Sequence, residues 1–325
     1  MLKKRGVFIG LLLLVLLVIM SYLTINTYGN WQFAWALRSK KIVAFLLVAL
    51  ATSSATISFQ TITQNQFLTP SVLGLDSLYV LVQTVLFFIV GGVTMLQQTG
   101  TGFFLTNIAL MVGLSQLLFF FLLKKGQMNL FLLLMTGVIL GTLFSSVSTF
   151  LQVVMDPNEY DLLQGKLFAS FGNIPSHYLV PATILISGTW LFLFYKSRYL
   201  DVFHLGQEQA INLGIDTERF QFLILCCVSL LTGTATALVG PLTFLGFIVA
   251  NVSYRLFATY RHRELFLGSF LVALLFLVGG QLLVEQIFKW NTTVSVIVEF
   301  SGGLYFMIKL IRERKTLDDR FKKGQ

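Results

Sequence analysis

The stretch YKSRYLDVFHLGQEQAINLGIDTERFQF (Tyr195–Phe222) decides how the rest of this chain is arranged. It is polar and charged, in a chain that otherwise consists mostly of hydrophobic runs and short joints. Hydrocarbon cannot satisfy charged side chains or irregular backbone, so the stretch must lie outside the lipid. Apolar residues nevertheless recur in it at helical spacing, between two glycines: Leu205, Ala210, Ile211 and Leu213, with Gly206 and Gly214. The pattern predicts one or two short helices at the membrane face, on which a partner outside the membrane acts.

The composition indicates an all-α polytopic membrane protein. Of 325 residues, 56% are hydrophobic and 11% are charged, whereas a soluble domain carries about a quarter charged residues. Too little polar sequence remains for a separate soluble domain, so we expect one transmembrane domain over residues 1–325. The net charge of +9 is interpreted as membrane sidedness and not as nucleic-acid binding, because the basic residues lie between the apolar runs and at both ends.

The apolar runs predict about ten membrane-spanning helices, with both termini in the cytoplasm. Each run approaches the roughly 20 residues that a tilted span needs. The first run follows a basic N-terminus but is too long for a signal peptide and lacks a small-residue cleavage site. The runs cover residues 7–25, 42–59, 72–96, 103–123, 128–154, 179–195, 220–239, 242–257, 265–288 and 293–311.

Basic residues support this orientation, since cytoplasmic loops are enriched in Lys and Arg. On the predicted cytoplasmic side lie Lys124 and Lys125, the loop 196–219, and the tail from Lys309 onward. One cluster is an exception and falls outside, which indicates a specific use for it: Arg38, Lys40 and Lys41.

The second and fifth spans contain many hydroxyl side chains. Hydroxyl groups are poorly placed against lipid, so they face other helices or a wet cavity. For any single residue, close helix packing and a role in a pathway both remain open, and Gly137 and Gly141 form a small-xxx-small pair that fits packing. Taken together, the two spans favour a pathway, lined by Ser53, Ser54 and Thr56 and by Ser145, Ser146 and Thr149.

Three acidic residues fall within apolar runs. Asp76 is placed to cap the helix that follows Gly74, and Glu285 lies near the outer end of its span. Glu299 lies near the middle of the last span with no basic partner in reach along the sequence. We interpret Glu299 as a pathway-lining or structural residue in preference to a proton relay.

The chain lacks the patterns of an enzyme. It has no G-x-x-x-x-G-K-[ST] phosphate loop, so it is not expected to hydrolyse ATP by itself. His177, His204 and His262 are scattered, and the adjacent Cys226 and Cys227 lie inside an apolar run, so we expect no metal site and no cofactor in this chain.

Three segments, in order, resemble the FecCD-type permeases, which are membrane subunits of ABC importers for iron–siderophores, haem and cobalamin. These are NQFLTPSVLGLDS (Asn65–Ser77), LGQEQAINLG (Leu205–Gly214) and GPLTFLGFIVAN (Gly240–Asn251). The resemblance implies the type II importer permease fold, with ten helices per subunit around a shared central pathway. It also implies three kinds of partner: a second permease subunit, identical or paralogous, two ATPase subunits, and an external substrate-binding lipoprotein or periplasmic protein.

The resemblance carries two sets of site residues onto this chain. The family's ATPase-coupling helix falls on Leu205, Gly206, Glu208, Ala210, Leu213 and Gly214. The family's basic R-x-P-R-like element, which docks acidic knobs of the binding protein, is matched at its two basic positions by Arg38 and Lys41, while Ser39 and Lys40 replace its middle residues. Lys289 is a further basic residue near the same side, and Ala250-Asn251 stands where family members often have Pro-His.

The sequence therefore predicts a permease in a bacterial cytoplasmic membrane that imports a ferric siderophore, with ATP and Mg²⁺ bound by the partner ATPase. Haem or cobalamin is an alternative substrate. A secondary transporter that couples uptake to an ion through Glu299 or Asp76 is an alternative of another class. The large ordered cytoplasmic loop and the expected lack of paired charges inside the membrane favour the importer.

Overall fold

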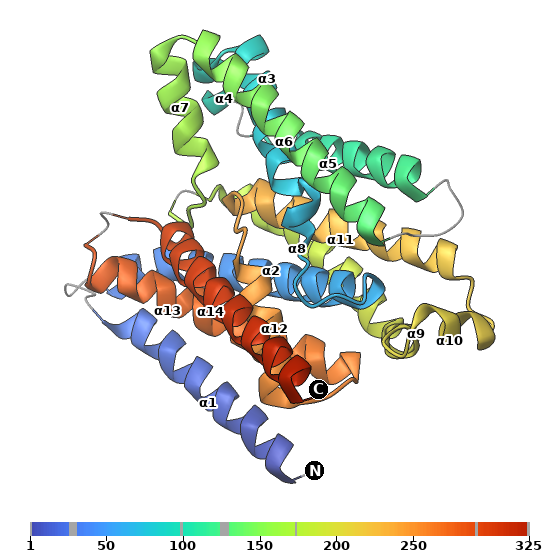
Figure 1. Cartoon of the computed structure of the whole chain (residues 1–325). Helices are drawn as coiled ribbons and strands as arrows, with labels where there is room; N and C mark the ends of the chain where they lie inside the picture. Colours follow the sequence, from blue (N-terminus) through green and yellow to red (C-terminus); the bar gives the residue numbers. More distant parts are fainter. Residues whose placement is uncertain are drawn as a thin grey trace.

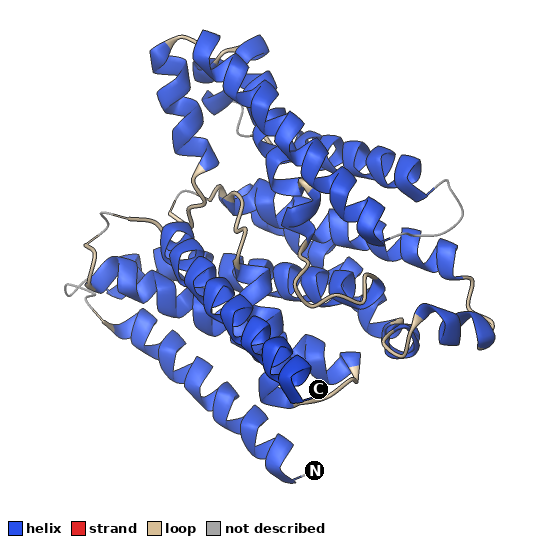
Figure 2. Cartoon of the chain, in the orientation of Figure 1, coloured by secondary structure: helices blue, strands red, loops and turns tan. Residues whose placement is uncertain are grey.

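The computed structural model describes residues 2–25, 31–97, 100–123, 130–172, 174–289 and 292–323. Within these ranges the chain is helical and contains no strand (Figure 2). The predicted all-α class is thus confirmed. The predicted cytoplasmic turn with Lys124 and Lys125 lies outside the described residues.

The helices follow one another with short connections (Figure 1). In chain order they are α1 Leu2–Thr24, α2 Trp31–Ile62, the 3₁₀ turn η1 Pro70–Leu73, α3 Leu75–Val90, α4 Gly92–Gln97, α5 Thr101–Leu123, α6 Leu130–Val154, α7 Pro157–Leu167, α8 Ser176–Tyr195, α9 Ser197–Phe203, α10 Gln207–Asn212, α11 Thr217–Val239, α12 Leu245–Phe257, α13 His262–Gln286 and α14 Val294–Lys323.

The number of spans agrees with the expectation of about ten. Within the described residues, eight helices are long and apolar enough to cross a membrane: α1, α2, α5, α6, α8, α11, α13 and α14. Two shorter apolar helices, α3 and α12, complete the set. The second span differs from its predicted start, because its helix begins at Trp31 and includes the basic cluster that was expected outside it.

The third predicted span is interrupted on both sides by glycines. Gly74 (φ +83°) separates η1 from α3, and Gly91 (φ +86°) separates α3 from α4. An L-residue side chain is disfavoured at such φ values, so glycine permits the two breaks. A Cβ atom added to Gly74 would also lie 2.9 Å from the Cα atom of Gly141 on α6. The Gly137 and Gly141 pair therefore serves close packing of α6 against η1, one of the two alternatives left open by the sequence.

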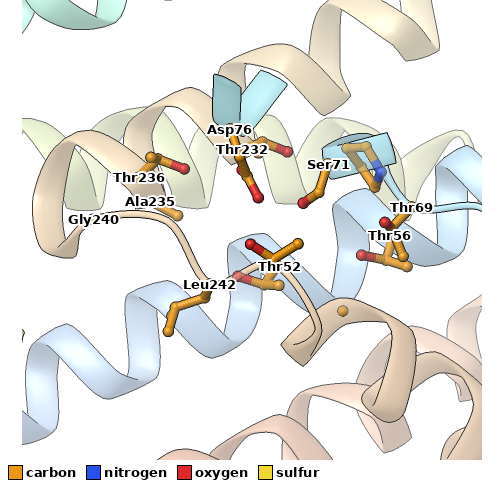
Figure 3. A pocket seen from close by; sticks show the side chains of 13 residues that line it. Thr52, Thr56, Thr69, Ser71, Asp76, Thr232, Ala235, Thr236, Gly240 and Leu242 are labelled. Atoms are coloured by element: carbon orange, nitrogen blue, oxygen red, sulfur yellow. The ribbon is translucent and has the colours of Figure 1, made fainter. Parts of the chain in front are cut away.

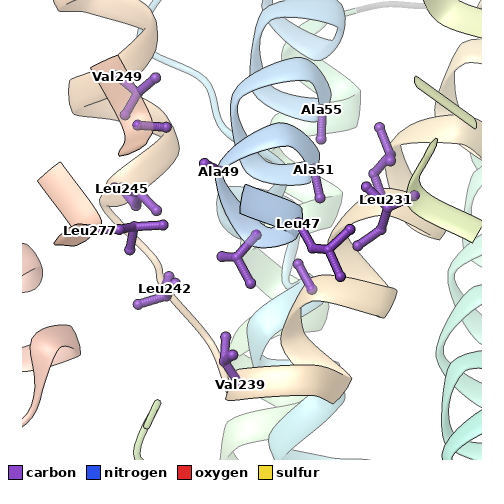
Figure 4. Packing of buried hydrophobic residues seen from close by; sticks show 14 of the residues in the cluster. Leu47, Ala49, Ala51, Ala55, Leu231, Val239, Leu242, Leu245, Val249 and Leu277 are labelled. Atoms are coloured by element: carbon purple, nitrogen blue, oxygen red, sulfur yellow. The ribbon is translucent and has the colours of Figure 1, made fainter. Parts of the chain in front are cut away.

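α2 is the central helix of the bundle. It packs against α11, α13, α8 and α12, and small and branched side chains fill the contacts (Figure 4). Ala49, Ala51 and Ala55 of α2 lie in this core near Leu231 of α11 and Leu245 of α12. Small residues at a helix contact let the backbones approach closely, which is how helices associate where lipid removes most of the hydrophobic driving force.

α1 and α14 lie at the periphery. In Figure 1 the N-terminal end of α1 and the C-terminal end of α14 both point to the lower right, and α9 and α10 lie on the right of the bundle. α7, the C-terminal end of α13 and the N-terminal end of α14 lie on the left, at the other end. An even number of spans brings the two termini to one side of a membrane, which agrees with this arrangement.

Candidate functional site

The predicted pair of short helices is present at one end of the bundle. α9 (Ser197–Phe203) and α10 (Gln207–Asn212) are joined through Gly206 at φ +121°, and Gly214 at φ +79° ends the unit. Asp216 then caps α11, because its carboxylate accepts a hydrogen bond from the backbone N–H of Arg219 at 3.2 Å. The two glycines thus mark turns that the backbone requires, as expected from the sequence.

A chain of three side chains fastens α9 to the bundle. Asp201 accepts hydrogen bonds at 2.7 Å from the backbone N–H of His262 and from its Nδ1 atom. The Nε2 atom of His262 lies 2.7 Å from the hydroxyl of Thr61 at the end of α2. An ionised carboxylate only accepts hydrogen bonds, so Nδ1 carries a proton. Burial by itself raises the pKa of Asp201, but the hydrogen bonds from His262 outweigh it and hold that pKa below its usual value.

Apolar side chains of this unit point in two directions. Ala210 is 0% exposed and packs inward, together with Leu200 and Phe203 of α9. Leu205 is 67% exposed and Leu213 65% exposed. Because the stretch is polar and lies outside the lipid, these exposed side chains are not covered by hydrocarbon. They form an apolar surface suited to a protein partner.

The six predicted coupling residues are therefore not equivalent. Leu205, Glu208, Leu213 and Gly214 are exposed, Gly206 is half-buried, and Ala210 is buried within the subunit. Ile211, which is 54% exposed, belongs to the same surface and was not among the predicted residues. A contact that Ala210 makes directly with a partner is not compatible with this structure, since its own subunit covers it.

The predicted docking role of Lys41 is wrong. Lys41 is 6% exposed, and its Nζ lies 3.5 Å from Oε1 of Glu285, which is buried as well. Arg38 is half-buried and donates hydrogen bonds to the carbonyl oxygens of Tyr22, Leu23 and Ile25 at the end of α1, at 2.7 to 3.1 Å. Basic side chains commonly satisfy the last carbonyls of a helix in this way. Both residues thus make contacts within the subunit.

The ion pair of Lys41 and Glu285 is part of a network between α1, α2 and α13. Glu285 also accepts hydrogen bonds from the Tyr22 hydroxyl at 3.3 Å and from Nε2 of Gln281 at 2.7 Å. The expectation that the spans lack paired charges is therefore wrong, and this criterion does not separate an importer from a secondary transporter. The sequence carried one signal for the pair: Glu285 is an isolated charge in an apolar run and needs a partner.

The hydroxyl groups predicted to line a pathway fall into two separate groups. Ser53 and Ser54 are 0% exposed and Thr56 is buried, all within the subunit on α2. Ser145, Ser146 and Thr149 are exposed on α6. The prediction that the two spans form one pathway surface is wrong for Ser53 and Ser54, because the neighbouring helices of their own subunit enclose them.

The acidic residues of α3 and α14 are also differently placed from the expectation. Gly74, and not Asp76, occupies the N-cap of α3, with no capping side chain. The side chain of Asp76 instead lies among the helices, close enough to Glu299 of α14 for the two acids to interact electrostatically. Glu299 is half-buried at the edge of an exposed apolar face of α14.

Lys309 does not belong to an exposed tail. It is buried on α14, donates a hydrogen bond to Oδ1 of Asn251 on α12, and has its Nζ 4.2 Å from the centroid of the Phe67 ring. Cation–π and amide contacts of this kind compensate a buried ammonium group. Asn251, one of the two residues that depart from the family's Pro-His, thus has a structural role in this chain.

Together these features define a class of protein: a multi-pass membrane permease whose ordered helical unit, α9 with α10, presents an apolar surface outside the lipid. The structure superimposes on a metal-chelate type ABC transporter in an inward-facing conformation with a TM-score of 0.82, covering 95% of this chain and 99% of that chain at 20% identity. At that identity the match shows the fold, which is the predicted permease fold.

The family follows from the sequence comparisons. The model of the FecCD transport family matches residues 6–312. The petrobactin import system permease protein YclO of Bacillus subtilis (strain 168) is 41% identical over 95% of this chain and 98% of its own length. The petrobactin import system permease protein FatC of Bacillus anthracis is 37% identical over 84% of this chain and 77% of its own length. The chain belongs to the FecCD transport family and is a permease subunit of an ABC importer, a transport subunit and not itself an enzyme.

Proposed function

We propose that this permease imports a ferric siderophore across a bacterial cytoplasmic membrane, with both of its termini in the cytoplasm. Two relatives that are 41% and 37% identical are named as petrobactin import permeases, so petrobactin is the first chelate to test. In this proposal the chain is one transmembrane domain without a cofactor of its own. Two partner ATPase subunits bind ATP and Mg²⁺, and an external binding protein delivers the chelate.

The observation that carries the proposal is the apolar surface of α10 and its flanks. Leu205, Ile211 and Leu213 are exposed on the unit formed by α9 and α10. The other face of this unit is held against the bundle by the hydrogen bond from His262 to Asp201 and by the buried side chain of Phe203. An ATPase that closes on nucleotide binding can move this unit as one body and so act on α2 and α13. Glu208, exposed in the first turn of α10, supplies a charge that sets the register of that contact.

The ATPase contact is tested with Leu213→Asp in the complete transporter reconstituted in proteoliposomes. A carboxylate in an apolar contact is desolvated without a partner, so we expect ATPase association and ATP-driven uptake to fall at least about tenfold. Ile287→Asp is the matched control, because Ile287 is 65% exposed at the other end of α13 and should leave ATPase association unchanged. Normal ATP-driven uptake by Leu213→Asp would contradict the assignment.

A second permease subunit is proposed to cover α6 and α14. Val153 on α6 is 80% exposed and Phe300 on α14 is 73% exposed, and the hydroxyls of Ser145, Ser146 and Thr149 lie exposed on α6. Such a face, apolar with interspersed hydroxyls, suits a partner helix and a bulky hydrogen-bonding ligand better than lipid alone. The pathway then runs between subunits, and Glu299 borders it.

Cysteine cross-linking tests this interface. Cys226 and Cys227 are replaced by serine, and a single cysteine is placed at Val153 or, as a control, at Ile184 on α8, which is 67% exposed. We expect a cross-linked permease pair from Val153→Cys in membranes containing the whole transporter, and none from Ile184→Cys. Equal cross-linking at both positions, or at Ile184 alone, would contradict the assignment of α6 to the interface.

The external docking surface is proposed to use Lys40 and Lys289, both of which are exposed near the outer end of the bundle. Charge pairs across an interface mainly raise the association rate and weaken with salt. Replacing both lysines by glutamate should slow association of the binding protein, most strongly at low salt, without loss of folded permease. Association that is unchanged at low salt would exclude these two lysines.

Substrate and energy source are measured in the same proteoliposomes, with the binding protein and ferric petrobactin, a ferric hydroxamate or haem. We expect ATP-dependent uptake of ferric petrobactin that an ionophore leaves intact. Uptake that needs no ATP and collapses with the ionophore would favour an ion-coupled carrier. ATP-dependent uptake of haem alone would overturn the siderophore assignment and leave the coupling assignment standing.

A further inference from the structure

A small, partly open cavity between helices of the bundle is lined by the side chain of Asp76, a half-buried residue (Figure 3). Its volume is about 30 Å³, which is room for about two water-sized groups. Hydroxyl side chains from four segments line it: Thr52 and Thr56 of α2, Ser71 of η1, Thr232 and Thr236 of α11, and Thr243 of the loop before α12. The cavity is an oxygen-rich compartment built from segments that are far apart in the sequence.

The cavity holds an acidic side chain without a basic partner among its described lining residues. Asp76 is the one charged residue among the described residues that line it. The hydroxyls of Ser71 and Thr243 interact with its carboxyl group, while the Oδ2 atom is buried without a hydrogen-bond partner. The neighbouring charge is that of Glu299, another acid, which repels Asp76. A buried polar atom left unpaired costs free energy, so this oxygen calls for a ligand.

The N-terminal end of α3 partly stabilises a negative charge on Asp76. Asp76 lies in the first turn of α3, where the helix dipole places partial positive charge, but that partial charge does not neutralise a whole negative one. Irregular backbone borders the cavity at η1 and at residues 240–244, and such backbone within a membrane protein is tolerated where it lines a polar cavity. Unwound segments of this kind commonly supply oxygen ligands to cations in transporters.

The donor set selects the kind of ion. Carboxylate and hydroxyl oxygens are ligands for hard cations, and no His or Cys is among the described residues of the lining, which disfavours transition metals. Asp76 is the one carboxylate among the described lining residues and balances one positive charge, whereas Glu299 does not line the cavity and so supplies no ligand for a divalent ion. We propose that this cavity binds one small monovalent cation, sodium, through Asp76 with the hydroxyls of Ser71, Thr243 and Thr56.

Such an ion would tie η1 and α3 to α2 and to the loop before α12. It binds a site that exists only in the folded chain, so it stabilises the permease by mass action. Sodium binding at this site does not depend on the chelate that is transported, because the ion acts on the stability of the permease itself and not on the transport cycle.

The test measures thermal unfolding of the purified transporter in detergent, with sodium varied against N-methyl-D-glucamine at constant ionic strength. We expect the unfolding midpoint of the wild-type permease to rise by at least about 2 °C with sodium, and less with potassium. Binding of radioactive ²²Na⁺ should be saturable, at one ion per permease chain. Asp76→Asn should remove both effects.

Two further variants keep the test decisive if Asp76→Asn fails to fold. Thr243→Val removes one ligand hydroxyl at nearly constant volume and should weaken sodium binding at least about threefold. Thr189→Val makes the same change on α8, where the hydroxyl donates to the Leu185 carbonyl away from the cavity, and should leave sodium binding unchanged. A wild-type midpoint that does not respond to sodium, or that responds equally to all the cations, would overturn the proposal.

Discussion

α2 and α6 are both apolar spans rich in serine and threonine, yet the structure uses them in opposite ways. In the most apolar stretch of α2, 72% of the residues are buried inside the subunit, against 11% in that of α6. The hydroxyls of α2 face helices of the same chain, and Thr56 also borders the Asp76 cavity. Those of α6 lie on the surface of the subunit, where a second permease is proposed to cover them.

A serine or threonine in a membrane span therefore does not show from the sequence whether protein, lipid or water surrounds its hydroxyl. On α6, Ser146 donates to the carbonyl of Thr142 at 2.8 Å and Thr149 donates to that of Ser145 at 2.9 Å. A hydroxyl bonded to the preceding turn of its own helix is tolerated against lipid, protein or water alike. On α2, by contrast, the hydroxyls of Ser54 and Ser58 are buried without a hydrogen-bond partner.

The largest effect is expected at the buried charge of α2. Lys41→Ala removes one partner of the buried pair with Glu285 and should destabilise the permease by about 3–5 kcal/mol. Lys40→Ala, on the next residue but exposed, should change stability by no more than about 0.5 kcal/mol. Thermal unfolding of the detergent-solubilised transporter measures both.

A double variant sharpens this result. Lys41→Met with Glu285→Leu removes both charges together and should recover much of the stability, because no uncompensated charge then remains buried. If Lys41→Ala proves as stable as Lys40→Ala, α2 does not keep its polar groups inside the subunit, and the contrast with α6 fails.

The next effect comes from adding volume to a hydroxyl position on each helix. Ser54→Leu overpacks a site that is 0% exposed and should cost about 1–3 kcal/mol of stability. Ser146→Leu adds the same volume on the exposed face of α6, so the separated permease should keep its unfolding temperature while uptake by the assembled transporter falls. Equal loss of stability in the two variants would erase the distinction between the helices.

A smaller effect on stability is expected at Gly137, where α6 packs closely against η1. A Cβ atom at Gly137 would lie 2.8 Å from Cδ2 and 3.0 Å from Cα of Leu73, so Gly137→Ala should cost about 1 kcal/mol. Gly113→Ala on α5, where a Cβ meets nothing within 4 Å, should be neutral or slightly stabilising. Unfolding of the two variants by guanidinium or by heat compares their stabilities directly. If the unfolding midpoint of Gly137→Ala is at or above that of Gly113→Ala, α6 does not approach η1 closely.

The smallest effect is expected from deleting single hydroxyls. Ser53→Ala and Ser146→Ala should change the uptake rate by no more than about twofold, since hydroxyl contacts between membrane helices average about 0.6 kcal/mol. Neither should change which chelate is carried, because tight binding within the pathway would trap the ligand and selection is proposed to rest with the external binding protein. A switch of substrate preference in either variant would place ligand recognition in the permease.

The fold class, the family and the position of the two short helices α9 and α10 follow from the sequence alone. Hydrophobic runs of span length, charged joints and three motifs in order are local signals, and each can be recognised without knowing its neighbours in space. Gly206 and Gly214, which bracket α10, are local signals of the same kind, because the turns that they form depend on backbone conformation alone.

Only the tertiary structure decided which polar groups face each other. Lys41 and Glu285 are 244 residues apart, and Asp201 and His262 are 61 apart, yet each pair is in contact. A helical span shows from its sequence that a charge needs a partner, but the rotation and depth of each helix decide which partner it meets. These come from the packing of small and branched side chains across the whole bundle, so α2 and α6 could not be told apart before that packing was known.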